Sequence, residues 1–173
     1  MKSLILKADE VQAVLAGRKT QHRLLVRLGC SWAVEDRNDG SLWPGYQDEA
    51  GMWEWARCPL GKRGEVVWVK ETWLELRDGH EHDSAKTHRR GIVRVGTTPR
   101  VNCVGYRADL EGYPESDELR RELGYVWRSS AIMPRWASRL TLAITSVRVE
   151  REGANWFWVI DFKVEATLTE RKP

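Results

Sequence analysis

Three side chains in this chain combine the residue types that acid–base chemistry on a nucleic-acid backbone needs. Lys19 and His22 lie three residues apart, and Glu71 stands at the end of an apolar run further along the chain. An imidazole titrates near neutral pH, and a histidine or a lysine can remove the proton of a 2′-hydroxyl group. The three residues are therefore a candidate catalytic set for RNA strand cleavage. The alternative is that they only hydrogen-bond one another across a pocket.

A short amphipathic helix is predicted to position the first of these residues. Asp9 is its expected N-cap and Gly17 its expected C-terminal stop. The apolar residues that fall on one face of this helix are Val11, Val14 and Leu15. The chain then enters a loop near the last helical carbonyls, where cations are favoured. The polar residues that this loop would present to a pocket are Lys19, Thr20, His22 and Arg23.

Two further segments are predicted to complete the pocket. The β-branched and aromatic run at 66–69 follows a glycine-bounded turn and reads as a buried strand. It leads to Glu71 and Trp73, where a carboxylate and an indole would face one cavity. Residues 133–139 contribute Arg135 and Trp136 before another strand begins.

The C-terminal part of the chain has the alternation of two long strands. In the strand expected over 139–149, the apolar positions change face near 145–146, which predicts a bulge or sharp twist there. In the last strand, four apolar residues share one face: Trp156, Trp158, Ile160 and Phe162. Asp161 and Lys163 lie on the other face.

These segments resemble the ASCH domain (activating signal cointegrator homology), in particular its phage and prophage branch. The five matching blocks, in chain order, are Gly17-Arg18-Lys19-Thr20, Cys58-Pro59 through Val69-Lys70-Glu71-Thr72-Trp73, Tyr106-Arg107-Ala108-Asp109, Met133-Pro134-Arg135-Trp136-Ala137-Ser138-Arg139, and Trp156-Phe157-Trp158-Val159-Ile160-Asp161-Phe162. The resemblance implies an α+β fold of the PUA-like superfamily, a small mixed β-barrel with a few short helices packed at its ends.

The resemblance also implies candidate activities, since some small ASCH proteins are acetylcytidine amidohydrolases and others are linked to RNA binding or cleavage. In the amidohydrolase pattern a lysine activates a threonine three positions later, and a helix supplies a glutamate. This chain has Lys19 but carries His22 in place of that threonine. Residues 151–155 bridge the gap where relatives have the long helical segment. The threonine mechanism therefore does not carry over directly.

Composition favours a single domain and a reducing compartment. At 173 residues the chain can bury a core without a metal or disulfides, and it has no apolar run of membrane-spanning length and no signal-peptide pattern. Its cysteines, Cys30, Cys58 and Cys103, are odd in number and lack CxxC spacing. We expect a soluble cytoplasmic protein that needs no cofactor.

The middle of the chain has the weakest pattern. Residues 75–101 are expected to form a poorly patterned insertion, and a short helix is predicted over 117–123. The histidines in the insertion, His80, His82 and His88, match no metal-ligand spacing, so we predict no metal.

Charge and aromatic content favour a nucleic-acid ligand. The net charge of +3 is modest, but residues 18–27 and 127–139 each carry several basic residues and no acidic one. Of the ten tryptophans, Trp73 and Trp136 lie beside polar motif residues and are the candidates for stacking on a base. Lys19 and Arg135 would contact phosphate or a base carbonyl, and Glu71 would accept from an exocyclic amine.

We therefore predict one pocket, between residues 17–23, 71–73 and 135–136, that binds a nucleotide, a modified nucleoside or single-stranded RNA. Tyr106, from the third matching block, is counted among its ligand-binding residues. Two alternatives remain open. One is an amidohydrolase or ribonuclease that uses Lys19, His22 and Glu71. The other is a phage accessory protein that binds a host protein through exposed aromatic residues.

Overall fold

The computed structural model describes residues 1–76, 92–95, 102–110 and 125–167 of this chain. They form a mixed α+β protein in which most elements are strands, with two short helices among the described residues. The elements, in chain order, are β1 (Lys2–Ile5), α1 (Ala8–Leu15), β2 (Gln21–Leu25), β3 (Ala33–Asp36), β4 (Leu42–Gln47), β5 (Trp53–Trp55), β6 (Val66–Lys70), β7 (Trp73–Leu76), β8 (Ile92–Val95), β9 (Asn102–Tyr106), α3 (Arg107–Leu110), the 3-10 turns Ser130–Ile132 and Arg135–Ala137, β10 (Leu140–Glu152) and β11 (Asn155–Thr167).

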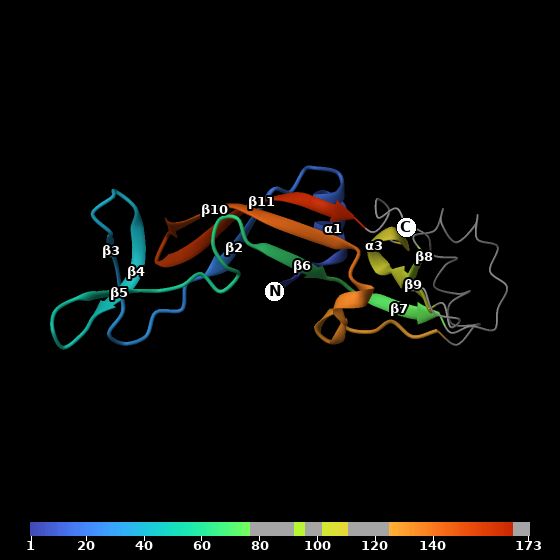
Figure 1. The fold of residues 1–173 in the computed structure, drawn as a ribbon, viewed down its shortest axis with the longest axis horizontal. Helices are drawn as coiled ribbons and strands as arrows, with labels where there is room; N and C mark the ends of the chain where they lie inside the picture. Colours follow the sequence, from blue (N-terminus) through green and yellow to red (C-terminus); the bar gives the residue numbers. More distant parts are fainter. Residues whose placement is uncertain (77–91, 96–101, 111–124, 168–173) are drawn as a thin grey trace.

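The strands form three sheets (Figure 1). The central sheet has the order β1-β6-β10-β11-β2, in which β1 and β6 are parallel and the other pairs are antiparallel. The β3-β4-β5 sheet lies at one end of the molecule, and the β7-β9-β8 sheet lies at the other end. In the part of the chain that the structure describes, β1 and β2 are open edges of the central sheet, so no closed barrel is formed.

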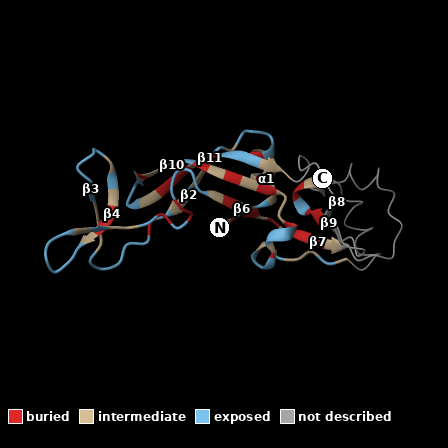
Figure 2. Ribbon diagram, viewed as in Figure 1, coloured by how far each residue is buried: buried red, intermediate tan, exposed pale blue. Residues whose placement is uncertain are grey.

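The main core lies on one face of the central sheet, under α1 (Figure 2). Alternate residues of β6, β10 and β11 point into it, as the period of two along a strand requires. On β11 the buried members are Trp158, Ile160 and Phe162, and Trp156 packs against them. The predicted apolar face of the last strand is therefore confirmed.

The β10–β11 hairpin contains the predicted irregularity. The pairing register shifts between Ile144 and Ser146, which leaves Thr145 as the extra residue of a bulge. A second shift lies between Thr141 and Leu142. The hairpin turn has only two residues, and its Gly153 has a φ of +59°, a conformation that favours glycine.

Helix α1 begins earlier than the sequence predicts. Its N-cap is Lys7 rather than Asp9, because the Glu10 carboxylate accepts a hydrogen bond from the Lys7 N–H at 3.0 Å and so satisfies a free donor at the helix start. The predicted stop at Gly17 is confirmed by its φ of +69°. Val11 and Val14 are buried as predicted, whereas Leu15 is exposed.

The segment after α1 is a strand and not the predicted loop. Residues 21–25 form β2, which pairs with β11, with His22 opposite Ile160 and Arg23 opposite Val159. The backbone groups at the edge of β11 favour this pairing, since every N–H and C=O there needs a partner. The Thr20 carbonyl extends the pairing by accepting from the Phe162 N–H at 2.9 Å.

Part of the predicted insertion is also regular structure. Residues 75–76 belong to β7, and residues 92–95 form β8; both strands pair with β9. The histidines of the insertion and the helix predicted over 117–123 lie outside the described residues. Among the described residues, no helix has the length and apolar character needed to cross a membrane.

Candidate functional site

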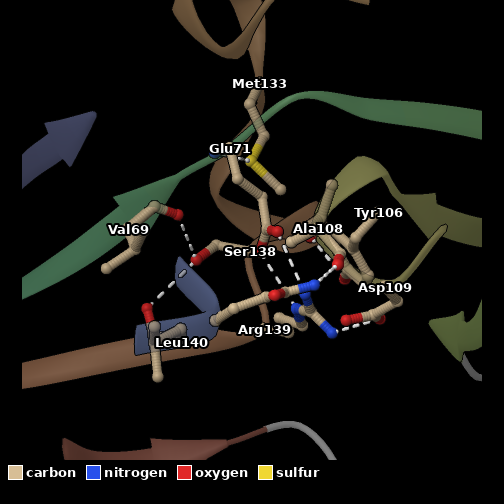
Figure 3. Close-up of polar contacts among 11 residues, drawn as sticks. Val69, Glu71, Tyr106, Ala108, Asp109, Met133, Ser138, Arg139 and Leu140 are labelled. Atoms are coloured by element: carbon tan, nitrogen blue, oxygen red, sulfur yellow. Dashed lines mark hydrogen bonds and ion pairs between the residues drawn. The ribbon is translucent and has the colours of Figure 1, made fainter. Parts of the chain in front are cut away.

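Glu71 lies at the centre of a buried charge network beyond the end of β6 (Figure 3). Its carboxylate accepts two hydrogen bonds from Arg139, with Nε 2.9 Å from Oε1 and Nη2 3.0 Å from Oε2. The remaining guanidinium nitrogen, Nη1, donates to the Asp109 carboxylate. Glu71 is 1% exposed. Both of its oxygens are therefore occupied by protein partners.

The surroundings of this network close it on several sides. The guanidinium carbon of Arg139 lies 4.1 Å from the centre of the Tyr106 ring, and the Tyr106 hydroxyl donates to the Ala137 carbonyl at 2.8 Å. The Ser138 hydroxyl donates to the Val69 carbonyl at 2.7 Å, as Figure 3 also shows. Tyr106, predicted as a ligand-binding residue, is thus fully buried under a protein cation.

Burial and charge act in opposite directions on the pKa values of this network. Burial raises the pKa of Glu71, and the neighbouring Arg139 guanidinium opposes that shift. Burial disfavours the charged form of Arg139, yet the Glu71 and Asp109 carboxylates raise its pKa overall. Arg139 donates from two nitrogens to the two carboxylate oxygens of Glu71, which is the geometry of an ionised pair.

The two tryptophans predicted to stack on a base lie against each other. The rings of Trp73 and Trp136 meet edge to face, with centroids 5.9 Å apart. Trp73 is 2% exposed and Trp136 is 44% exposed, so only Trp136 offers a surface to a ligand. Arg135, in the same 3-10 turn as Trp136, is exposed. The structure therefore brings Trp73, two residues after Glu71, into contact with Trp136. The ligand-binding roles of these residues stay a prediction.

Lys19 and His22 lie in a different group, which is built on α1 and β2. The Lys19 amine is 3.2 Å from the Glu10 carboxylate, and His22 Nδ1 is buried without a hydrogen-bond partner. Burial, followed by the positive charge of Lys19, lowers the pKa of His22, while Glu10 opposes the shift. Across the described residues, no hydrogen bond or ion pair connects this group to Glu71 or Arg139.

Arg23 is occupied as well. It forms ion pairs with Glu150 at 3.3 Å and Glu152 at 3.4 Å, and its guanidinium lies over the Phe157 ring. The Lys19 and Arg23 charges that were predicted to attract a ligand are thus balanced by protein carboxylates. Their roles in ligand binding stay a prediction.

Sequence reasoning missed a cleft of about 680 Å³ between the β3-β4-β5 sheet and the central sheet, away from Glu71. Its charged and aromatic lining, which defines what we call the basic cleft, consists of Lys2, Arg37, Arg57, Lys62, Arg63, Glu65, Trp43 and Trp55. Five side chains are cationic and one is acidic. In the described part of the chain, the side chains of Arg57, Lys62 and Arg63 form no ion pair with a carboxylate. The Glu65 carboxylate accepts from the backbone N–H of Lys62 at 3.4 Å.

The indoles of the basic cleft are held in place by the protein. Trp43 Nε1 donates to the Ala56 carbonyl at 2.8 Å, and the Trp43 ring meets the core residue Trp158 edge to face. The Arg37 guanidinium lies over both cleft indoles, 5.0 Å from the centre of Trp43 and 5.9 Å from that of Trp55. A sequence signal was present, because three tryptophans between residues 37 and 63 are flanked by basic residues, but nothing local shows that they face one cleft.

A second cleft, of about 620 Å³, lies next to the basic cleft. It shares Ala56 and Arg57 with the basic cleft, and its other walls include Trp32, Pro44 and Trp158. Neither cleft is lined by Lys19, Glu71 or Trp136. Among the described residues, no group of three histidine, cysteine or acidic side chains could hold a metal ion.

Together, the fold and the site define a mixed α+β protein with an open, positively charged and indole-lined cleft. No protein-family model matches the chain, and no curated protein or solved structure matches it either.

Proposed function

We propose that this protein binds nucleic acid through the basic cleft, and that it is a PUA-like protein of the ASCH type. The ASCH assignment rests on the five sequence blocks and their order along the chain. A mixed fold of strands with short helices is compatible with it. The binding proposal rests on the cleft itself.

The observation that carries the proposal is the charge balance of the basic cleft. Three of its cations, Arg57, Lys62 and Arg63, have no carboxylate partner among the described residues. A cleft lined mainly by charges of one sign focuses its field and raises the local concentration of anions. A nucleic-acid backbone supplies such anions at regular spacing, and their binding releases counterions.

The size and the aromatic lining of the cleft agree with this ligand. A volume of about 680 Å³ lies in the range of ligand pockets, roughly 300–1,000 Å³. Indoles beside cations provide stacking surfaces for bases next to contacts for phosphates. The region around Glu71 lacks this combination, because its buried guanidinium is already paired with two carboxylates.

The experiment is a binding titration of a labelled 12-nucleotide single-stranded RNA, followed by fluorescence anisotropy at several salt concentrations. We expect affinity to fall steeply with salt. The triple variant Arg57→Ala/Lys62→Ala/Arg63→Ala should bind more weakly, with the slope of log K against log [salt] reduced by about 2, since each lost phosphate contact removes roughly 0.7.

Matched controls separate the basic cleft from general positive charge. Lys163 is exposed on β11, outside the cleft, so Lys163→Ala should leave the titration unchanged. Arg135→Ala tests the pocket predicted from the sequence. Binding by the triple variant at wild-type strength would overturn the proposal, and a stable complex with a host protein in its place would favour an accessory role.

A second candidate function is hydrolysis at Lys19 and His22. The observation that favours it is the buried, unpartnered Nδ1 of His22 beside the Lys19–Glu10 pair, because a lowered pKa keeps the imidazole neutral and able to accept a proton. Glu10 would then take the place foreseen for Glu71. Acetylcytidine deacylation or RNA cleavage by the wild type, abolished in Lys19→Met and His22→Asn, would support this function. Equal residual activity in all three proteins would reject it.

A further inference from the structure

We propose that the β3-β4-β5 sheet is a stacking platform for unpaired bases, with the base seated over Trp55 and Trp43 where the Arg37 guanidinium now lies. This inference rests on the proposed function and specifies it: the ligand is single-stranded, and its bases contact the indoles while its phosphates contact the cleft cations.

The strand register places the indoles on one face of this small sheet. Gly45 lies opposite Trp55, and Gln47 lies opposite Trp53. Since alternate residues share a face, Trp43, Gly45, Trp53 and Trp55 all belong to the same side. The Trp53 and Trp55 rings are stacked, with centroids 5.1 Å apart and planes 10° apart.

Gly45 lets the Trp53 and Trp55 rings pack closely against the neighbouring strand. A Cβ atom at this position would stand 2.8 Å from Cε3 of Trp55 and 3.2 Å from Cε3 of Trp53. Any larger residue would therefore push the rings away from the sheet. The glycine therefore lets the stacked pair of indoles lie close against β4.

This surface is not simply the core of the small sheet. Within β3, β4 and β5 the buried residues are Pro44 and Gly45, while the indoles of Trp43, Trp53 and Trp55 stay half-buried. Figure 2 shows the same sheet mostly in the colours of intermediate and exposed residues. Burying these three large rings completely would stabilise the protein. Their partial exposure beside unpaired cations is therefore typical of a surface that binds a ligand.

Arg37 marks the seat of the base. It is exposed, and its planar guanidinium lies over both Trp43 and Trp55. A guanidinium stacks on an indole much as a base does, since both are flat and both interact with the ring face. Trp43 is fixed by its hydrogen bond to Ala56, so the seat exists before a ligand arrives.

Stacking on the platform would make the protein distinguish a single strand from a duplex, which the cations alone would not do. Phosphate contacts favour a duplex at least as much as a single strand, because the duplex carries the higher charge density. Stacking on Trp55 requires a base that is not already paired and stacked in a helix. The protein should therefore prefer a single strand over a duplex of the same length, with little dependence on base sequence.

The test compares one labelled 12-nucleotide RNA strand with the same strand annealed to its complement. Trp55→Ala should weaken single-strand binding by between about 5-fold and 150-fold and leave duplex binding unchanged. Trp55→Phe, which keeps a ring, should recover most of the loss. Trp68→Ala is the matched control, because Trp68 also has a cation over its ring, that of Lys70 at 5.1 Å, but lies on β6 outside the cleft.

The outcomes separate this inference from the proposed function. Single-strand binding by Trp55→Ala at wild-type strength, together with loss of binding in the Arg57→Ala/Lys62→Ala/Arg63→Ala variant, would overturn the platform and keep the basic cleft. Undiminished binding by the triple variant would overturn the proposed function. Since Trp55→Ala could unfold the small sheet, unchanged duplex binding by the same preparation serves as its folding control, and Trp53→Ala provides a second measurement of the platform.

Discussion

Arg139 and Glu71 form a bidentate ion pair inside the protein, although they stand 68 positions apart in the sequence. The pair joins the end of β6 to the residue that precedes β10. Asp109, next to it, adds α3 to the same network. Three segments distant in sequence are thus held together by one guanidinium.

Replacing Glu71 by alanine should destabilise the protein by about 3–5 kcal/mol, because the Arg139 charge would stay buried with one partner fewer. Urea unfolding followed by circular dichroism measures this change. Arg23→Ala is the comparison: its ion pairs with Glu150 and Glu152 are at the surface, so its loss should cost less than about 1 kcal/mol. Equal losses in the two variants would contradict the structural role of Glu71.

His22 should make stability depend on pH on the acidic side of neutrality. Its pKa in the folded state lies below the ordinary value of 6.5, so on acidification the unfolded chain takes up the proton first. The contribution of the neutral imidazole is complete above pH 6.5 and is lost as pH falls from there through the folded-state pKa.

Urea midpoints of the wild type and of His22→Gln, measured from pH 8 to pH 5, test this dependence. The wild type should lose more stability than the variant between pH 6.5 and pH 5. The other three histidines are the same in both proteins, so the difference between the curves reports His22. Parallel curves would show that burial of His22 does not favour its neutral form.

Asp161 should be important for the bulge in β10. Its carboxylate accepts from Ser146, from Arg148 and, at 2.9 Å, from the amide of Gln21, and these bonds, that of Ser146 foremost, hold its pKa below the usual range. Asp161→Ala should cost about 1–3 kcal/mol in thermal or urea unfolding. Glu165→Ala, at an exposed position of the same strand, should be nearly neutral, and a similar cost for both would refute this role.

Cys30 and Cys58 should differ in reactivity. Cys30 is exposed, whereas Cys58 is buried and burial raises the pKa of its thiol, so it holds little thiolate at neutral pH. Iodoacetamide should modify Cys30 in the native protein and Cys58 only after unfolding. Peptide mass mapping distinguishes both from Cys103, and rapid native labelling of Cys58 would contradict its burial.

Much of the local structure was predictable from the order of residues. The strand at 66–70, the stop at Gly17, the bulge near 145–146 and the apolar face of β11 all agree with the prediction. Each depends on a property of a few neighbouring residues: a period of two, a change of phase, or a residue that tolerates a positive φ. The start of α1 was misplaced by two residues. The helix begins after Lys7, whose backbone N–H donates to the Glu10 carboxylate, and not after Asp9.

The candidate site could be predicted only in part. Trp73 and Trp136 are in contact, whereas Lys19 and His22, predicted to share a pocket with them, lie with Glu10 in another group. The difference arises because residues 21–25 pair with β11 as an edge strand. Which strand edge a polar segment joins is decided by distant partners and not by its own pattern.

The amino-acid sequence by itself determined the elements whose pattern is local, such as the strand at 66–70 and the apolar face of β11. Only the tertiary structure decided that Arg139 neutralises Glu71 and that Arg37, Arg57 and Lys62 line one cleft with the indoles of the small sheet. Local patterns follow from backbone geometry, whereas the balance of charge around a side chain depends on which distant segments fold beside it. A carboxylate that the sequence predicts to be free for a ligand can therefore be fully paired in the folded protein. Cations that are far apart in the sequence can line one cleft.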